Sequence, residues 1–422
     1  MYLFLYTIFL FLFKAGVRVA AIKSNKAKQW LAGRKDIFQR LEQNISKQDK
    51  IIWFHCASLG EFEQGRPVLE KIKISYPGYK ILITFFSPSG FEVRKNYTGA
   101  DYIFYLPIDS ARNAKKFLDI VHPSLVVFVK YEYWYYYFKS IGERKIPFLL
   151  ISAVFRADQP FFKWYGSLYK KMLACFTHIF VQDNQSNELL HRIGFTENVS
   201  IAGDTRFDRV VEIADQFEPI PAIENYCSNG KVIIAGSTWA DDEKMLQSLT
   251  QNINDSSVKL IIAPHETGKD HINEIQKLFS SSVLYSQLTT HHSQLTTQNS
   301  PLIIDSIGIL SRLYKYAYIT YIGGGFTRDG IHNSLEAAVY GKPVIFGPVY
   351  NKYREAVELI DAEGAKSFST ADELKQIIYT LLNDKEEYEQ KCKLAEQYVR
   401  LNAGATAKIL KYIQENRLLT NW

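Results

Sequence analysis

The sequence alternates short apolar runs with longer amphipathic stretches, and it does so twice along its 422 residues. The first series of apolar runs covers 51–54, 81–85, 102–105, 125–129, 147–152 and 178–181. A second series reads "KVIIAGS", "VKLIIAP", "SSVLY", "PLIIDS", "YAYITYIGGG" and "KPVIFG". Strands that alternate with helical patterns, such as those at 65–75 and 111–121, are typical of parallel α/β sheets. The sequence therefore predicts two successive doubly wound α/β domains.

The boundary between the two series lies in a stretch with two prolines and few strong apolar blocks. We expect a linker there, over 203–230, between a first domain over 29–202 and a second over 231–400. A C-terminal helix over 401–422 is expected to pack back on the first domain. Domains of this kind bind ligands at the carboxyl ends of their strands, so we expect the two sheets to face a cleft.

The net charge of +6 is concentrated at the N-terminus, because residues 1–50 hold ten Lys and Arg against three Asp and Glu. A nucleic-acid-binding module spreads its basic surface through a folded domain. This distribution therefore argues against a nucleic-acid partner.

The first thirteen residues, "MYLFLYTIFLFLF", carry no charge. They are fewer than the ~20 residues that span a bilayer, and no basic region precedes them as in a signal peptide. Basic residues follow at once, as expected beside an anionic membrane surface. We expect residues 1–28 to form a membrane anchor, with residues 1–22 either spanning the bilayer or lying in its interface. The alternative is a first helix packed on the protein's own core.

The four cysteines are far apart and form neither a disulfide framework nor a zinc motif, which favours a reducing compartment. His291 and His292 lie in the polar repeat "SQLTTHHSQLTTQNS", which we interpret as a surface insertion. With no D-x-D motif and no convincing metal cluster in the sequence, we expect neither a metal nor a cofactor.

The stretch "HCASLGEFEQGRP", 55–67, follows the first apolar run and admits three interpretations. It could be a phosphate-binding loop, a catalytic site or a helix cap. One glycine cannot form the G-x-G-x-x-G dinucleotide motif, so Gly60 is free to make the turn. Glu61 then lies in the first turn of a helix, where a carboxylate also interacts favourably with the helix dipole.

The stretch "YIGGGFTRDGIHNSLEAAVYGKPVIFGP", 321–348, places glycines directly after a strand. Glycines such as Gly324 and Gly325 permit close backbone approach and unusual φ angles. We expect "HNSLEAAVYG" to be a helix, with Asn333 and Glu336 three residues apart on one face. A helix N-terminus attracts phosphate, and a carboxylate there can accept ribose hydroxyl groups.

These motifs resemble those of the GT-B glycosyltransferases, and most specifically of the Kdo (3-deoxy-D-manno-octulosonic acid) transferases of lipid A assembly. The matching segments are "SLGE" at 58–61, "EYW" at 132–134, "GDTRFD" at 203–208 and "GIHNSLE" at 330–336. The chain departs from the family pattern at Ile331 and Ser334, which replace a glycine and a proline. Arg206 replaces a lysine, and "APHE" lacks the arginines of the family's corresponding motif.

The resemblance implies a GT-B fold of two Rossmann-like domains, the first binding the acceptor and the second the nucleotide sugar. It implies that Glu61 is the general base and that Glu132 positions the acceptor or the base. The implied substrate-binding residues are Ser237, Thr238, His265, Gly308, Gly324, Gly325, Asn333, Glu336, Arg206 and Arg66. From the residues alone, Ser237 and Thr238 equally fit a helix cap, and His265 a structural role.

The resemblance further implies an inverting transfer of Kdo from CMP-Kdo to a lipid A precursor at the cytoplasmic face of the cell inner membrane. One alternative is a GT-B transferase that uses a UDP-sugar and a lipid acceptor. Another is a nucleotide-sugar-binding membrane module without catalysis. The aromatic run "YEYWYYYF", 131–138, fits a membrane interface, an acyl-binding surface or simple core packing.

Overall fold

The computed structural model describes residues 2–130, 132–228, 230–252, 257–290 and 300–420. The chain forms two compact units. Unit 1 comprises Met1–Asp208 together with Gly404–Trp422, and unit 2 comprises Arg209–Ala403. The expected surface insertion with His291 and His292 lies outside the described residues.

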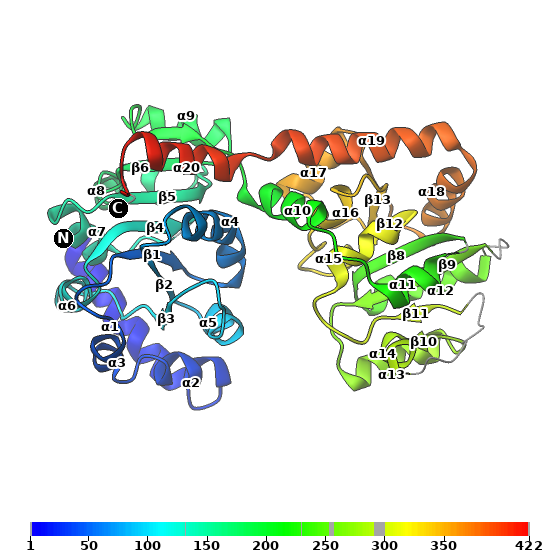
Figure 1. Cartoon of the computed structure of the whole chain (residues 1–422), viewed down its shortest axis with the longest axis horizontal. Coiled ribbons are helices and arrows are strands. Elements are labelled where there is room, and N and C mark those ends of the chain that lie inside the picture. The colour runs from blue at the N-terminus through cyan, green and yellow to red at the C-terminus, as the bar shows by residue number, and fades with distance from the viewer. Residues whose placement is uncertain (1, 131, 229, 253–256, 291–299, 421–422) are drawn as a thin grey trace. The chain divides into compact units, whose positions relative to one another are not determined.

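Unit 1 contains a seven-stranded parallel sheet with the strand order β3-β2-β1-β4-β5-β6-β7 (Figure 1). Its strands are β1 (Ile51–Cys56), β2 (Lys80–Phe85), β3 (Tyr102–Tyr105), β4 (Pro123–Val129), β5 (Phe148–Ala153), β6 (His178–Val181) and β7 (Val199–Ile201). Its helices are α1 (Tyr2–Ala20), α2 (Asn25–Ala32), α3 (Ile37–Asn44), α4 (Leu59–Ser75), α5 (Pro88–Arg94), α6 (Ala111–Val121), α7 (Tyr135–Glu143), η1 (Pro160–Phe162), α8 (Ser167–Leu173), α9 (Asn184–Arg192) and α20 (Ala405–Glu415). Helix α10 (Thr205–Asp215) begins in unit 1 and continues into unit 2.

The strands of unit 1 are apolar on both faces because helices cover both faces of the sheet. Alternate residues of β1 divide accordingly: Trp53 packs in the cluster that includes α3, α6, α7, α8 and α9. Ile52 and Phe54 pack in the cluster that includes α4 and α20. Continuous burial explains why these strands are recognisable as unbroken apolar runs.

Unit 2 repeats this plan with a parallel sheet in the order β10-β11-β9-β8-β12-β13-β14. Its strands are β8 (Lys231–Thr238), β9 (Val258–Pro264), β10 (Val283–Leu284), β11 (Leu302–Ile303), β12 (Ile319–Ile322), β13 (Val344–Phe346) and β14 (Ala365–Ser367). Its remaining helices are α11 (Pro221–Cys227), α12 (Ala240–Asn252), α13 (Lys269–Leu278), α14 (Tyr285–Thr290), α15 (Leu310–Leu313), η2 (Tyr314–Tyr316), α16 (Leu335–Ala338), α17 (Arg354–Asp361), α18 (Ala371–Asn383) and α19 (Lys385–Asn402).

The predicted fold class is confirmed, since both units are doubly wound parallel α/β sheets. Three details differ from the sequence-based expectation. Helix α4 begins at Leu59, before the helical pattern at 65–75, while the expected position of Glu61 in its first turn is confirmed. The segment expected to be a linker, 203–230, contains the helices α10 and α11. The edge strands β7 and β14, of three residues each, are not among the apolar runs predicted as strands.

Helix α1 is held along unit 1 by polar contacts near its N-terminus. The Tyr6 hydroxyl donates to the buried Asp109 carboxylate at 2.6 Å, and the Thr7 and Tyr136 hydroxyls lie 2.9 Å apart. Asp109 also accepts the backbone N–H groups of Tyr136 and Tyr137. Burial raises the pKa of Asp109 to about 6. One side of α1 is therefore anchored, while most of its apolar side chains stay exposed.

Helix α20 packs against α4 within unit 1 (Figure 1). Asp208 fixes the start of α20 because its carboxylate accepts the backbone N–H groups of Gly404 and Thr406 and the Thr406 hydroxyl. Gly404 precedes the helix with a φ of 113°, a conformation that suits glycine. Asp208 thus holds together the two points at which the chain leaves and re-enters unit 1.

Replacing Asp208 with Ala is expected to loosen α20, because it removes the acceptor of three hydrogen bonds. We expect a loss of about 2 kcal/mol in the local stability of α20. Hydrogen exchange of residues 405–415 measures it. Asp215→Ala is the matched control, since it removes only an exposed ion pair to Arg400 at 3.4 Å, which is worth less than ~1 kcal/mol. Equal exchange in the two variants would contradict the assignment.

Candidate active site

In both sheets the crossover direction reverses at one point, between β1 and β4 in unit 1 and between β8 and β12 in unit 2. Loops that leave adjacent strands in opposite directions open a crevice at the carboxyl ends of those strands, where doubly wound domains bind ligands. Glu61 lies in the first turn of α4, which follows β1, and Glu132 follows β4. Ser237 and Thr238 end β8, Trp239 follows them, and the glycines from Gly323 onward follow β12.

Glu61 lies in the first turn of α4 and is buried. Its Oε2 accepts the backbone N–H of Ala57 in a short hydrogen bond, while the N-cap residue Ser58 makes no side-chain cap. The Glu61 carboxylate therefore caps the N-terminus of α4, in agreement with the interpretation of this stretch as a helix cap. The same contact fixes its position at the end of β1.

Glu132, at the end of β4, is held by His55 from the neighbouring strand β1. The His55 Nε2 lies 3.4 Å from the Glu132 Oε2, and the His55 ring is fully buried. The His55 Nδ1 lies 2.8 Å from the Thr84 Oγ1 on β2. Trp53 donates its indole N–H to the same Thr84 oxygen at 2.7 Å.

The His55 Nδ1 also lies 3.1 Å from the Thr84 backbone carbonyl, and the Thr84 hydroxyl donates to the Phe54 carbonyl at 3.5 Å. The buried network thus positions the His55 ring against the Glu132 carboxylate from inside the sheet.

Two further groups near the site, Cys56 and Arg34, have pKa values that burial shifts. Burial raises the pKa of the Cys56 thiol, and the negative charges of Glu61 and Glu132 act in the same direction. The Arg34 guanidinium donates to the backbone carbonyls of Phe86 and Leu106 at 2.8 and 2.9 Å. Burial lowers the pKa of Arg34 to about 9, a value at which it is still cationic at pH 7.

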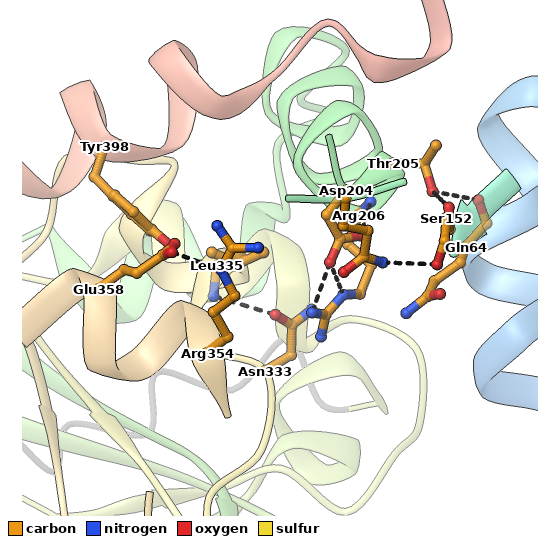
Figure 2. Close-up of polar contacts among 11 residues, drawn as sticks. Gln64, Ser152, Asp204, Thr205, Arg206, Asn333, Leu335, Arg354, Glu358 and Tyr398 are labelled. Atoms are coloured by element: carbon orange, nitrogen blue, oxygen red, sulfur yellow. Dashed lines mark hydrogen bonds and ion pairs between the residues drawn. The ribbon is translucent and has the colours of Figure 1, made fainter. Parts of the chain in front are cut away.

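The two arginines expected to contact anions have carboxylate partners within unit 1. The Arg66 Nε donates to the Glu70 Oε1 at 2.8 Å. The Arg206 Nε and Nη2 both donate to the Asp204 Oδ2, at 2.9 and 2.7 Å (Figure 2). In this arrangement their charge is already compensated, so an anion would have to compete with these carboxylates.

The motif "GDTRFD" also has a structural role in unit 1. The buried Thr205 hydroxyl donates to the backbone carbonyl of Gln64 on α4 and lies 3.0 Å from the Ser152 hydroxyl on β5 (Figure 2). This contact fixes the start of α10 against α4 and β5.

In unit 2 the glycine loop after β12 is held by Asp242, which is fully buried on α12. Its carboxylate accepts the Tyr321 hydroxyl at 2.8 Å and the backbone N–H groups of Gly324 at 2.8 Å and Trp239 at 2.9 Å. Gly324 has a φ of 91° and is approached by the carbonyl of Gly330, so a side chain there would clash. Gly325 lies equally close to the backbone of Gly347.

Ser237 and Thr238 end β8 in different ways. Ser237 is half-buried and has a φ of 55°, a strained conformation for a non-glycine residue. Thr238 is fully buried, and its hydroxyl donates to the Glu243 Oε1 at 3.0 Å. The expectation that Thr238 donates to phosphate is therefore not met in this arrangement, because burial turns its hydroxyl toward α12.

Three rings stack at the carboxyl ends of β8, β9 and β12. His265 lies between Trp239 and His332, with ring-centroid distances of 4.7 and 4.4 Å. The Trp239 indole N–H donates to the His332 Nε2 at 3.3 Å. Burial lowers the pKa of His332 to about 4, and the neighbouring His265 acts in the same direction. His332 is thus an electrically neutral acceptor at pH 7.

Asn333 and Glu336 contact each other, but the expected helix is shorter than predicted. Helix α16 begins at Leu335, so Asn333 precedes it. The Asn333 side chain accepts the Leu335 N–H at 3.1 Å and donates to the Glu336 Oε1 at 3.0 Å (Figure 2). Gly308 follows β11 on an open surface, with a φ of 97°.

Sequence reasoning missed four residues of these sites: His55, Trp239, Asp242 and His332. Each has a partner far along the chain or on another element, and its own position in the sequence gives no sign of that partner. Among the described residues, no group of three or more His, Cys, Asp or Glu side chains is placed to hold a metal ion.

The low pKa of His332 predicts a pH dependence of stability. An unfolded histidine titrates near 6.5, so the unfolded chain binds this proton more readily than the folded protein does. The contribution of His332 to stability is present above pH 6.5 and is lost as the pH falls toward about 4. We expect the urea midpoint to fall less between pH 7 and pH 5 in His332→Gln than in the wild type.

The control for this experiment is His191→Gln, because His191 is exposed on α9. Its pH dependence should equal that of the wild type. An unchanged pH dependence in His332→Gln would show that His332 titrates normally.

Comparisons with known proteins point to one family. A model of the family "3-Deoxy-D-manno-octulosonic-acid transferase (kdotransferase)" matches residues 34–209. The chain is 25% identical to the 3-deoxy-D-manno-octulosonic acid transferase of Haemophilus influenzae over 410 residues, which cover 94% of each protein. It is 28% identical to the transferase of Aquifex aeolicus over 317 residues, or 74% of this chain and 80% of that protein.

Among solved structures, the UDP-GlcNAc 2-epimerase from Neisseria meningitidis bound to UDP-GlcNAc superposes with a TM-score of 0.61. It is 17% identical and covers 87% of this chain and all of its own, so the likeness concerns the fold alone. The GT-B-like fold, the family model and the relatives agree. The chain is therefore a glycosyltransferase that is similar to the Kdo transferases.

Proposed function

We propose that this protein transfers Kdo from CMP-Kdo to a lipid A precursor with inversion, at the cytoplasmic face of the cell inner membrane. The observation that carries the proposal is the position of Glu61 and Glu132 at the crossover reversal of unit 1. Both residues belong to segments that match motifs of the family, and the family model covers both.

Glu61 is the proposed general base. A sugar hydroxyl that attacks an anomeric carbon must lose its proton as the new bond forms, and a positioned carboxylate can accept it. A carboxylate offers about four acceptor positions, so accepting the Ala57 N–H is compatible with accepting a substrate hydroxyl. The helix cap and the base are then two roles of one group, and the cap keeps the base in position.

Glu132 is the proposed acceptor-positioning residue. Its orientation depends on His55, whose buried Nε2 lies 3.4 Å from the Glu132 Oε2. A group held in this way loses little entropy when it binds a hydroxyl, which favours a productive geometry.

Unit 2 is proposed to bind the nucleotide sugar at its own crossover reversal. The fixed backbone around Gly324 and the side chains of Ser237, His265 and Asn333 are the proposed contacts. Glu336, held by Asn333, is proposed to accept ribose hydroxyls. Oriented backbone N–H groups and dipoles stabilise a leaving phosphate without reorganisation during the reaction. The expected cleft between the two domains stays a prediction.

Helix α1 is proposed to hold the enzyme on the membrane. Over Leu3–Ala20 it is apolar enough and long enough to cross a bilayer, judged by length and composition, with a mean hydropathy of 1.8. Because Tyr6 and Thr7 bind α1 to unit 1, the arrangement favours a helix that lies in the interface. Exposed Phe4, Phe11 and Leu12 would then enter the lipid.

The decisive variant is Glu61→Gln, which keeps an oxygen to accept the Ala57 N–H but cannot accept a proton from the acceptor. We expect transfer from CMP-Kdo to fall by about 10²- to 10⁴-fold, while binding of CMP to the protein is retained. Product formation with a purified lipid A precursor and calorimetric titration with CMP measure the two quantities.

The matched control is Glu63→Gln on the same helix. Glu63 pairs with Arg94 at 2.5 Å on the solvent side, so transfer should stay within about twofold of the wild type. Undiminished transfer in Glu61→Gln would exclude Glu61 as the base. Absence of transfer in the wild type, with tight nucleotide binding, would favour the non-catalytic module.

A further inference from the structure

A cavity of about 490 Å³ lies within unit 1, between α1 and α8. Leu5 and Phe9 of α1 form one wall, and Leu168 and Met172 of α8 form the opposite wall. Glu132 and Trp134, which follow β4, also line it. The volume lies within the ~300–1,000 Å³ typical of small-molecule sites.

The lining is aromatic and aliphatic apart from Glu132 and the hydroxyl groups of its four tyrosines, Tyr6, Tyr133, Tyr165 and Tyr169. Glu132 brings a carboxylate to the cavity, and His55 fixes that carboxylate from the buried side. The Trp134 ring lines the cavity, while its indole nitrogen is buried. The Glu132 carboxylate can accept hydrogen bonds, so the cavity offers a charged acceptor beside a largely apolar space.

The surroundings of the cavity are also apolar. Phe4 and Leu12 of α1 are exposed, and Trp164, just before α8, is 91% exposed. Exposed aromatic and aliphatic side chains of this kind are typical of surfaces that lie in a membrane interface. The cavity thus adjoins the surface that the proposed function places on the membrane.

We infer that this cavity binds one acyl chain of the lipid acceptor, so that the chain places the sugar next to Glu132. The inference rests on the proposed function and names the part of unit 1 that recognises the lipid. A sugar hydroxyl can donate to the Glu132 carboxylate. A membrane phospholipid carries its phosphate near the start of its chains, and the Glu132 charge disfavours that phosphate.

Leu168→Trp tests the inference by filling the cavity from α8. We expect the KM for the acylated acceptor to rise at least tenfold. The KM for the same acceptor with its acyl chains removed should stay within about twofold, because that molecule does not use the cavity. Val93→Trp is the matched control, since Val93 is an exposed apolar residue of α5 outside the cavity.

Phe9→Ala provides a second variant that is expected to fold, because Phe9 is exposed on α1 and only covers the cavity. It should raise the KM for the acylated acceptor in the same selective way. Binding of each variant to vesicles without acceptor is measured in parallel. For Leu168→Trp, vesicle binding equal to that of the wild type supports the acceptor as the occupant.

Two results would overturn the inference while leaving the proposed function intact. One is a wild-type enzyme that transfers Kdo, with Leu168→Trp and Phe9→Ala affecting both acceptors equally. The other is a loss of vesicle binding in Leu168→Trp as large as its KM effect, which would assign the cavity to bulk lipid. If the wild type transfers Kdo to neither acceptor, the proposed function itself fails.

Discussion

Carboxylates that accept backbone N–H groups hold the loops and helix starts on which both candidate sites depend. Asp242 binds the N–H groups of Gly324 and Trp239, and Glu61 binds that of Ala57. Asp109 and Asp208 do the same at the starts of α7 and α20. Hydrogen bonds to a charged acceptor are worth about 1.5–3 kcal/mol each. They fix backbone that would otherwise be free to move where strands end.

These contacts also explain how a parallel sheet becomes a site. The crossover reversal opens a crevice between two loops, but the topology alone supplies no reactive side chain there. In unit 1 the carboxylates of Glu61 and Glu132 are brought to that space, one by a helix start and the other by a buried histidine. In unit 2 the same position carries fixed glycine backbone and a stack of three rings. The units share a topology and differ in the groups that they present.

The strands and the two-domain organisation could be predicted from the sequence because buried parallel strands are continuous apolar runs. Glu61 could be proposed because the segment "SLGE" resembles a motif of the Kdo transferases. The partner of Glu132 could not, since His55 lies 77 residues away inside a strand and looks like part of the core. Asp242 likewise lies 82 residues from Gly324. The positive charges of Arg66 and Arg206 are evident from the sequence. Their pairing with the carboxylates of Glu70 and Asp204 became evident only in the structure.

The choice of donor tests the central claim most directly. The purified full-length protein would be loaded with a fluorescent cytidine nucleotide, and unlabelled CMP-Kdo and UDP-sugars would compete for it. The account predicts that CMP-Kdo displaces the probe at concentrations at least a hundredfold lower than UDP-GlcNAc or UDP-glucose. Displacement by a UDP-sugar at lower concentrations than CMP-Kdo would contradict it and assign the chain to another donor.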